Sequence, residues 1–258
     1  SEYMDVEVQR DGFVYNLRFE KGFNVGGLKK TPSKSKATYT HITFKPDLDV
    51  FTDIDIPLDY YHEIIKKQAI VNKNLKFILI DEESGETFEY LYENGIMDYI
   101  LEATKDDEIM TPRFCELETK GMDREDRADY KLKAEIVFAF TQSTSSMEYY
   151  HNSSFLEYGG SPDKAVKNAF VYAMDRYLKH GEKKKKNEKK VSFIDIQESL
   201  VIIVNSFSTH TSYENQTKKA INNKFIQEAL TGFLREQLKI FFIENNEVAE
   251  KIMAQILV

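Results

Sequence analysis

The stretch from Leu200 to Lys218, LVIIVNSFSTHTSYENQTK, most constrains how this chain can fold. It opens with the apolar run Leu200–Val204, whose β-branched residues suit a buried or half-buried strand. Polar residues follow from 205 to 214, and from Ala220 onward the pattern becomes helical. The sequence therefore predicts a strand, a polar loop and a helix, with the triplet Gln216-Thr217-Lys218 just before the helix.

The triplet has the donors of an anion-binding site. The Gln216 amide offers two hydrogen-bond donors and the Lys218 ammonium offers three. Lysine is a flexible point charge, so both groups can converge on one phosphate. The alternative is a solvated turn with a surface lysine, because a three-residue motif is weakly specific.

Composition excludes several classes of protein. The chain has 258 residues, 41% of them hydrophobic, which is enough for one large domain or two small ones. Its net charge of −8 excludes a surface that is basic throughout, so any DNA contact must be local. The single cysteine, Cys115, excludes an internal disulfide and predicts a reducing compartment. No apolar run reaches the ~18 residues of a membrane span and no signal-peptide pattern is present, so we predict a soluble, cytoplasmic protein without a membrane partner.

The first hundred residues alternate between strands and helices. Two strands joined at Asp11-Gly12 are predicted for residues 1–19, and a loop for residues 20–36. The later patterns predict a strand at 38–45, a helix from Pro57, strands at 75–80 and 88–92, and a helix at 95–103. Because the chain begins inside a sheet, we expect that it lacks the front of a larger domain.

A second domain is predicted after a polar, charged segment at residues 104–130, with the boundary near 104. Ser161 is a good N-cap before Pro162, so a helix begins there, and Ser192 to Asp195 reads as a capping box. The remaining patterns predict strands at 114–120, 130–140 and 145–152, a long helix after the triplet and a last helix at 247–258.

Several stretches resemble the B subunits of type IIA DNA topoisomerases, the family of DNA gyrase and topoisomerase IV. The stretches are RDG…Y..RFEKG (Arg10–Gly22), TFKPDLDVF (Thr43–Phe51), residues 58–86, the turn YGGSPDKA (residues 158–165) and the triplet with its strand and helix. The usual GGTH of the family is GGSP here, and Tyr39 stands where bacterial members have a glycine. The resemblance covers the whole chain. It implies an α+β fold: the C-terminal half of a GHKL-type ATPase domain at 1–104, then a transducer domain of the ribosomal-protein-S5-domain-2-like fold at 105–258.

The resemblance also implies an ATP site. Gln216 and Lys218 would contact the γ-phosphate, Thr40 would help bind the adenine, Ile42 would touch its ring, and Arg10 would lie at the pocket mouth. The catalytic glutamate, the magnesium-binding asparagine, the aspartate that reads adenine and the glycine-rich lid lie upstream in the family, and none of their motifs occurs here. We therefore expect ATP and Mg²⁺ in the parent protein, but no catalytic residue, no metal site, no tightly bound nucleotide and no independent ATPase activity in this chain.

The parent would be an ATP-hydrolysing topoisomerase, an isomerase whose transducer relays nucleotide state to DNA strand passage. Its implied partners are double-stranded DNA, the A subunit and a second B subunit through the ATPase domain. A lysine-rich segment is either a solvated loop or a weak DNA contact, since lysines neutralise phosphates without reading sequence. Its members are Lys183, Lys184, Lys185, Lys186, Lys189 and Lys190.

Two other function classes stay open on the sequence. One is a related GHKL ATPase, MutL-like or Hsp90-like, and the other is a non-enzymatic interaction module with a decayed ATP site. The triplet and the TFKPD and YGGSPDKA stretches favour a topoisomerase. Nothing in the chain distinguishes gyrase from topoisomerase IV, because the DNA-wrapping domain belongs to the A subunit.

Overall fold

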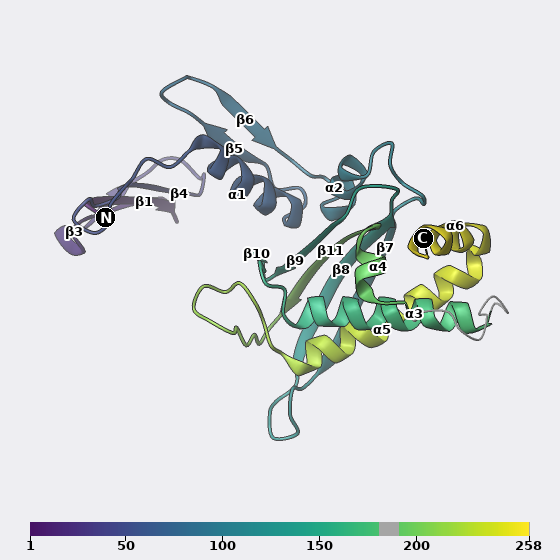
Figure 1. Ribbon diagram of the computed structural model, residues 1–258. Coiled ribbons are helices and arrows are strands. Elements are labelled where there is room, and N and C mark those ends of the chain that lie inside the picture. The colour runs from purple at the N-terminus through teal and green to yellow at the C-terminus, as the bar shows by residue number, and fades with distance from the viewer. Residues whose placement is uncertain (181–190, 258) are drawn as a thin grey trace. The chain divides into compact units, whose positions relative to one another are not determined.

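The computed structural model describes residues 1–180 and 191–257. The chain divides into two compact units, residues 1–60 and 61–258, and each is described by itself (Figure 1). The described residues form helices together with sheets that pair mainly antiparallel, so the predicted α+β class is confirmed. No helix in the described residues is long and apolar enough to cross a membrane.

The first unit is built on an antiparallel sheet with the strand order β3-β2-β1-β4. Its strands are β1 (Tyr3–Arg10), β2 (Phe13–Glu20), β3 (Phe23–Pro32) and β4 (Tyr39–Lys45). The turn between β1 and β2 places Asp11 and Gly12 at φ values of 53° and 77°. A two-residue hairpin turn with both φ values positive matches the twist of its strands. The predicted hairpin is therefore confirmed.

Strand β3 occupies a segment for which the sequence predicted a loop. It is exposed along its whole length, so it lacks the alternating apolar side chains that mark a half-buried strand. Backbone pairing with β2 holds it in place, after a tight turn in which Lys21 and Gly22 have φ values of 46° and 87°. The prediction of a loop over residues 20–36 was wrong. Alternation of apolar and polar residues cannot reveal a strand whose two faces are both exposed to solvent.

The second unit is built on a mixed sheet with the strand order β10-β9-β11-β8-β7. Its strands are β7 (Arg113–Gly121), β8 (Tyr130–Phe140), β9 (Ser146–His151), β10 (Ser154–Phe155) and β11 (Leu200–Ser208). The predicted apolar strand, β11, lies at the centre, antiparallel to β8 and parallel to β9. It continues to Ser208, so the predicted polar loop begins four residues later than Asn205, which is buried within the strand.

Helices cover both faces of this sheet (Figure 1). Along β8, Phe138 packs with α3 and α5, whereas Val137 faces the end of α1 and α2, as side-chain alternation in a strand requires. The helices are α1 (Leu58–Val71), α2 (Ile96–Ala103), α3 (Ser161–His180), α4 (Phe193–Gln197), α5 (Lys224–Glu244) and α6 (Asn246–Ile256). A separate hairpin, β5 (Phe77–Ile80) and β6 (Thr87–Tyr90), links α1 to α2.

The proposed domain boundary near residue 104 falls within the second unit. No sheet in the described residues combines strands from the two sides of residue 104. The side chains of Ile96 and Ile100 on α2 nevertheless share a core with Val137 and Ile203 beyond it. The domain boundary near residue 104 therefore stays a prediction. Helix α2, which precedes it in the sequence, packs against the sheet that follows it.

Candidate functional site

The predicted triplet lies at the tip of the segment 209–223 between β11 and α5, which we call the QTK loop. Its stem is a short antiparallel ladder. Tyr213 pairs with Ile221, the Glu214 N–H donates to the Ala220 carbonyl at 3.0 Å, and the Asn222 N–H donates to the Ser212 carbonyl at 2.9 Å. Because Ile221 belongs to this stem, α5 begins only at Lys224, four residues after the predicted start at Ala220.

The tip presents its side chains to solvent. Gln216 and Lys218 are exposed, and neither side chain is hydrogen-bonded to another described residue. Lys218 has a φ of 58°, and its N–H donates to the Asn215 carbonyl at 3.2 Å, which closes the turn. Its ammonium lies 5.5 Å from the centre of the Tyr213 ring, a weak cation–π contact at an exposed site. The donors of Gln216 and Lys218 are therefore available to an anion.

A glycine turn holds the stem of the QTK loop. The Ser161 N–H donates to the Ile221 carbonyl at 2.8 Å, and the Tyr158 N–H donates to the Lys219 carbonyl at 2.9 Å. Gly160 has a φ of 81°, and a Cβ atom there would lie 2.1 Å from the Ile221 carbonyl oxygen. Only glycine fits this close approach of two backbones. The glycine pair before α3 thus sets where the QTK loop attaches.

A partly buried polar cluster fixes the downstream end of the loop. The Asp123 carboxylate accepts hydrogen bonds from the Phe225 N–H, the Tyr130 hydroxyl and the Asn223 amide, each at 2.9 Å. Asn223 is 1% exposed, and its own Oδ1 accepts from the Ser212 N–H at 2.8 Å. The same cluster therefore holds the start of α5 and the stem of the loop. Sequence reasoning missed it, although an asparagine just before a helix is a usual N-cap signal.

A buried histidine supports the upstream end. The His151 Nδ1 lies 2.8 Å from the Ser206 hydroxyl, and its Nε2 lies 3.0 Å from the Ser208 hydroxyl and 2.9 Å from that of Thr211. The ring is wholly buried, and burial lowers the pKa of His151 to about 4. The imidazole is therefore neutral near pH 7 and acts as a hydrogen-bonding support for the first residues of the loop.

The other three candidate residues share one face of the sheet in the first unit. Thr40 pairs with Val8 and Ile42 with Val6, so strand alternation places their side chains on the same face as Arg10. Ile42 is 52% exposed, and among the described residues the Arg10 guanidinium pairs with exposed Asp11 alone, at 3.0 Å. An open apolar surface with a hydroxyl and a guanidinium at its border is chemically suited to a planar heteroaromatic ring.

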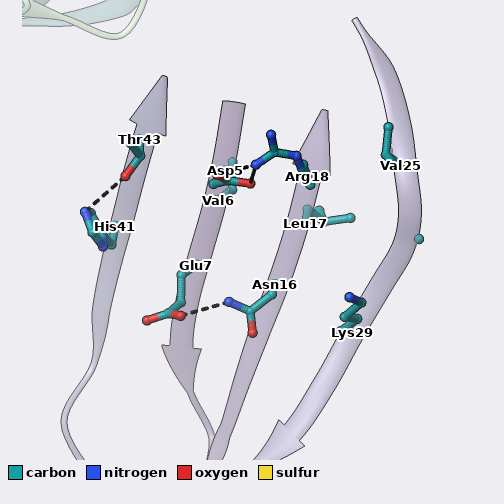
Figure 2. A pocket seen from close by; sticks show the side chains of 11 residues that line it. Asp5, Val6, Glu7, Asn16, Leu17, Arg18, Val25, Lys29, His41 and Thr43 are labelled. Atoms are coloured by element: carbon teal, nitrogen blue, oxygen red, sulfur yellow. Dashed lines mark hydrogen bonds and ion pairs between the residues drawn. The ribbon is translucent and has the colours of Figure 1, made fainter. Parts of the chain in front are cut away.

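The opposite face of this sheet carries a shallow polar pocket of about 370 Å³, shown in Figure 2. Two of its carboxylates are hydrogen-bonded within the pocket: Arg18 donates twice to Asp5, at 2.8 and 3.0 Å, and Asn16 donates to Glu7 at 2.8 Å. Hydrogen bonds from Tyr39 and Asn16 lower the pKa of Glu7. The pocket is a self-neutralised surface on the face turned away from Thr40 and Ile42.

Two further predictions concern metal and DNA. Within residues 1–180 and 191–257, no group of three or more His, Cys, Asp or Glu side chains is placed to hold a metal ion. The candidate DNA contacts lie outside the described residues: Lys183, Lys184, Lys185, Lys186, Lys189 and Lys190.

Sequence comparison places the chain among known proteins. The model of the family described as DNA gyrase B matches residues 95–258. The chain is 29% identical over 259 residues to the B subunit of DNA topoisomerase 4 from Streptococcus pneumoniae, covering 98% of this chain and 38% of that protein. It is 28% identical over 261 residues to the B subunit of DNA gyrase from Mycoplasmoides gallisepticum, covering 99% of this chain and 40% of that protein. The chain thus spans about two fifths of the length of these relatives.

Solved structures show the same fold. The ATP-binding domain of topoisomerase IV from Francisella tularensis superposes with a TM-score of 0.76 at 24% identity, covering 99% of this chain and 68% of that one. The B subunit of DNA gyrase from Myxococcus xanthus superposes with a TM-score of 0.78 at 16% identity, covering 99% of this chain and 71% of that one. At these identities the likeness shows the fold alone.

Proposed function

Because this chain belongs to the DNA gyrase B family, we propose that it is part of the B subunit of a type II DNA topoisomerase, which couples ATP hydrolysis to DNA strand passage. The chain would form the second half of the ATPase domain and the transducer that follows it. The family match favours this function over a MutL-like or Hsp90-like ATPase and over a non-enzymatic module. In this proposal the enzyme is either gyrase or topoisomerase IV.

The QTK loop carries the proposal. Its tip exposes an amide and an ammonium, while backbone pairing and the glycine turn hold its stem. We assign Gln216 and Lys218 to the γ-phosphate of ATP. A charge-assisted hydrogen bond that ATP allows and ADP does not gives the two nucleotides different affinities. Only such a difference in affinity allows a nucleotide to shift a conformational equilibrium.

The first unit would supply part of the base pocket. The Thr40 hydroxyl would hydrogen-bond the adenine, Ile42 would pack on its ring and Arg10 would border the entrance. ATP would supply the phosphoryl group whose hydrolysis drives the cycle, and Mg²⁺ would neutralise its phosphates. We place the magnesium ligands and the catalytic base in parts of the subunit outside this chain, which fits the match to about two fifths of the relatives' length.

Residues 105–258 would act as the transducer. A change in the position of the QTK loop would be transmitted through β11, which is the central strand of the sheet and leads into the loop. The partners would be double-stranded DNA, an A subunit and a second B subunit. The lysine-rich segment at 183–190 would add a weak contact with DNA phosphates, since its charges carry no sequence information. The setting would be the cytoplasm.

DNA strand passage tests this function. The complete B subunit, assembled with its A subunit, is assayed for ATP-dependent supercoiling or relaxation of plasmid DNA. Replacing Lys218 with alanine should lower the rate at least tenfold and leave the melting temperature unchanged. Lys224→Ala is the matched control, because Lys224 is a 72% exposed lysine that pairs only weakly, at 3.7 Å, with Glu228. Normal strand passage by the Lys218 variant would refute the assignment.

A further inference from the structure

A two-residue turn joins β9 to β10 and lies beside the stem of the QTK loop. Its residues, Asn152 and Ser153, have φ values of 47° and 63°. Positive φ is uncommon for residues with a side chain, and asparagine adopts it more readily than serine. The conformation is maintained by the pairing of Ser154 with His151 across the turn.

The Asn152 side chain is bonded to the end of β11 and to the beginning of the QTK loop. Its Oδ1 accepts from the Ser208 N–H at 3.0 Å. Its Nδ2 donates to the Ser208 carbonyl at 3.2 Å and to the Thr211 hydroxyl at 3.1 Å. One amide thus pairs with both backbone groups of the last residue of β11 and reaches three residues into the loop. His151, which is buried next to it, supports the hydroxyls of the same two residues.

The other residue of the turn is bonded to α1. The Gln68 side chain donates to the Ser153 carbonyl at 3.0 Å. The end of α1 is held nearby, because the buried Asn205 of β11 donates to the Val71 carbonyl at 3.4 Å. The turn therefore contacts α1 through Ser153 and the QTK loop through Asn152. Two adjacent residues of the turn thus link α1 to the end of β11 and the start of the loop.

We propose that Asn152 is a positioning residue, which fixes the stem of the QTK loop against α1 so that the tip presents Gln216 and Lys218 in one place. The inference rests on the proposed function, because the position of the tip affects ATP turnover only if the tip contacts the γ-phosphate. Asn152 touches no nucleotide. It acts through the loop, since its three hydrogen bonds hold Ser208 and Thr211, which lead directly into the stem.

The turn offers a matched pair of variants for the test. Asn152→Gly keeps a backbone that adopts positive φ easily and removes all three side-chain bonds to Ser208 and Thr211. Ser153→Gly makes the same change at the next residue, keeps the carbonyl that Gln68 binds, and loses only a long 3.4 Å contact with Asn72. Both variants relieve backbone strain, so both should fold. Asn152→Asp is a second probe, which keeps the acceptor for the Ser208 N–H and removes the donors.

ATP turnover is measured in the complete B subunit for these variants, for Lys218→Ala and for the double variant Asn152→Gly with Lys218→Ala. We expect kcat/KM to fall about tenfold in Asn152→Gly, by less in Asn152→Asp and by less than twofold in Ser153→Gly. The double variant should lose less than the product of the two single losses, because Asn152 then acts through a tip that has lost its ammonium and keeps only the Gln216 amide.

The outcomes separate the two claims. Equal turnover in the two glycine variants would overturn the inference, and so would an independent, multiplicative loss in the double variant, because both results would give Asn152 a merely structural role. A damaged Lys218→Ala with a normal Asn152→Gly would overturn the inference and leave the proposed function standing. A normal Lys218→Ala would overturn the assignment of Lys218 to the γ-phosphate, and with it the premise of the inference.

Discussion

Lys218 and Lys219 are neighbours with different environments. The Lys219 ammonium forms an ion pair with Glu157, and its carbonyl accepts the Tyr158 N–H at 2.9 Å. Lys218 is instead exposed on a backbone with φ of 58°, and its ammonium makes only a weak contact with the Tyr213 ring among the described residues. The second of these lysines anchors the loop and the first is available to a ligand. This difference supports our proposal that Lys218 rather than Lys219 contacts the γ-phosphate.

The neutral state of buried His151 predicts a loss of stability in acid. Burial lowers its pKa from 6.5 to about 4, so between these pH values the unfolded chain binds a proton that the folded chain does not. The contribution of neutral His151 to the free energy of unfolding is therefore complete above pH 6.5 and is lost as the pH falls toward 4. The loss is up to about 1.4 kcal/mol per pH unit, or roughly 3 kcal/mol in all. Urea unfolding across this range measures the effect.

His151→Gln is the control for that prediction, because glutamine can donate and accept hydrogen bonds but does not titrate. The free energy of unfolding of the natural chain should fall more steeply than that of the variant between pH 6.5 and pH 4. Parallel curves would show that His151 is not the group responsible.

At the scale of residues, the sequence reveals local motifs and hides long-range partners. Gln216 and Lys218 could be predicted because they stand two residues apart at the end of one loop. His151 and Asp123 could not, because their partners Ser206 and Phe225 lie 55 and 102 residues away in the sequence. Only strand register and loop packing bring such pairs together. Arg10, Thr40 and Ile42 occupy the shared face by alternation, but their predicted contact with adenine depends on the family resemblance.

Among the elements, the ones that bury a regular face were the most predictable. Strand β11 has a β-branched run with buried side chains, and helix α4 opens with a capping box in which Asp195 accepts from the Ser192 N–H at 2.8 Å. Both were predicted from local chemistry. Strand β3 was missed because it buries neither face. The delayed start of α5 also escaped prediction, since Ile221 pairs with residues outside its own helix.

The glycine turn before α3, to which the stem of the QTK loop is bonded, leads to a prediction about stability at Gly160. Alanine there should lower the free energy of unfolding by more than about 3 kcal/mol, the range of large losses that overpacking at a special backbone conformation produces. The Cβ would lie 2.1 Å from one backbone atom of Ile221 and 2.8 Å from another, and neither can move without breaking the stem. Chemical denaturation of the purified chain provides the measurement.

Gly85→Ala separates crowding from backbone strain in that experiment. Gly85 lies in the same unit with a similar φ of 78°, but a Cβ there meets no atom within 4 Å. Its replacement should cost only the strain of a positive φ, about 1–2 kcal/mol. A similar loss for both variants would mean that the close approach of Gly160 to Ile221 is not rigid.

On the scale of the whole molecule, the chain is expected to bind ATP weakly or not at all by itself. The face that carries Thr40 is open, with Ile42 and Phe44 exposed by 52% and 59%, so it encloses no ring. In the proposed function, the groups that bind magnesium and the adenine amino group belong to parts of the subunit other than this chain. Titration calorimetry with a non-hydrolysable ATP analogue should detect no binding at micromolar concentrations. A micromolar dissociation constant would show that these residues form a complete site.

A contact between Lys218 and the γ-phosphate is central to the proposed function, and the affinity ratio of two nucleotides tests it most directly. Dissociation constants of the non-hydrolysable ATP analogue and of ADP are measured for the complete B subunit and for its Lys218→Ala variant. Losing one charge-assisted hydrogen bond costs about 1.5–3 kcal/mol, so the variant should bind the ATP analogue roughly ten- to a hundredfold more weakly. Its affinity for ADP, which has no γ-phosphate, should be unchanged. If the ratio of the two affinities were the same in the variant as in the unmodified subunit, whether both affinities fell equally or neither fell, a contact between Lys218 and the γ-phosphate would be contradicted.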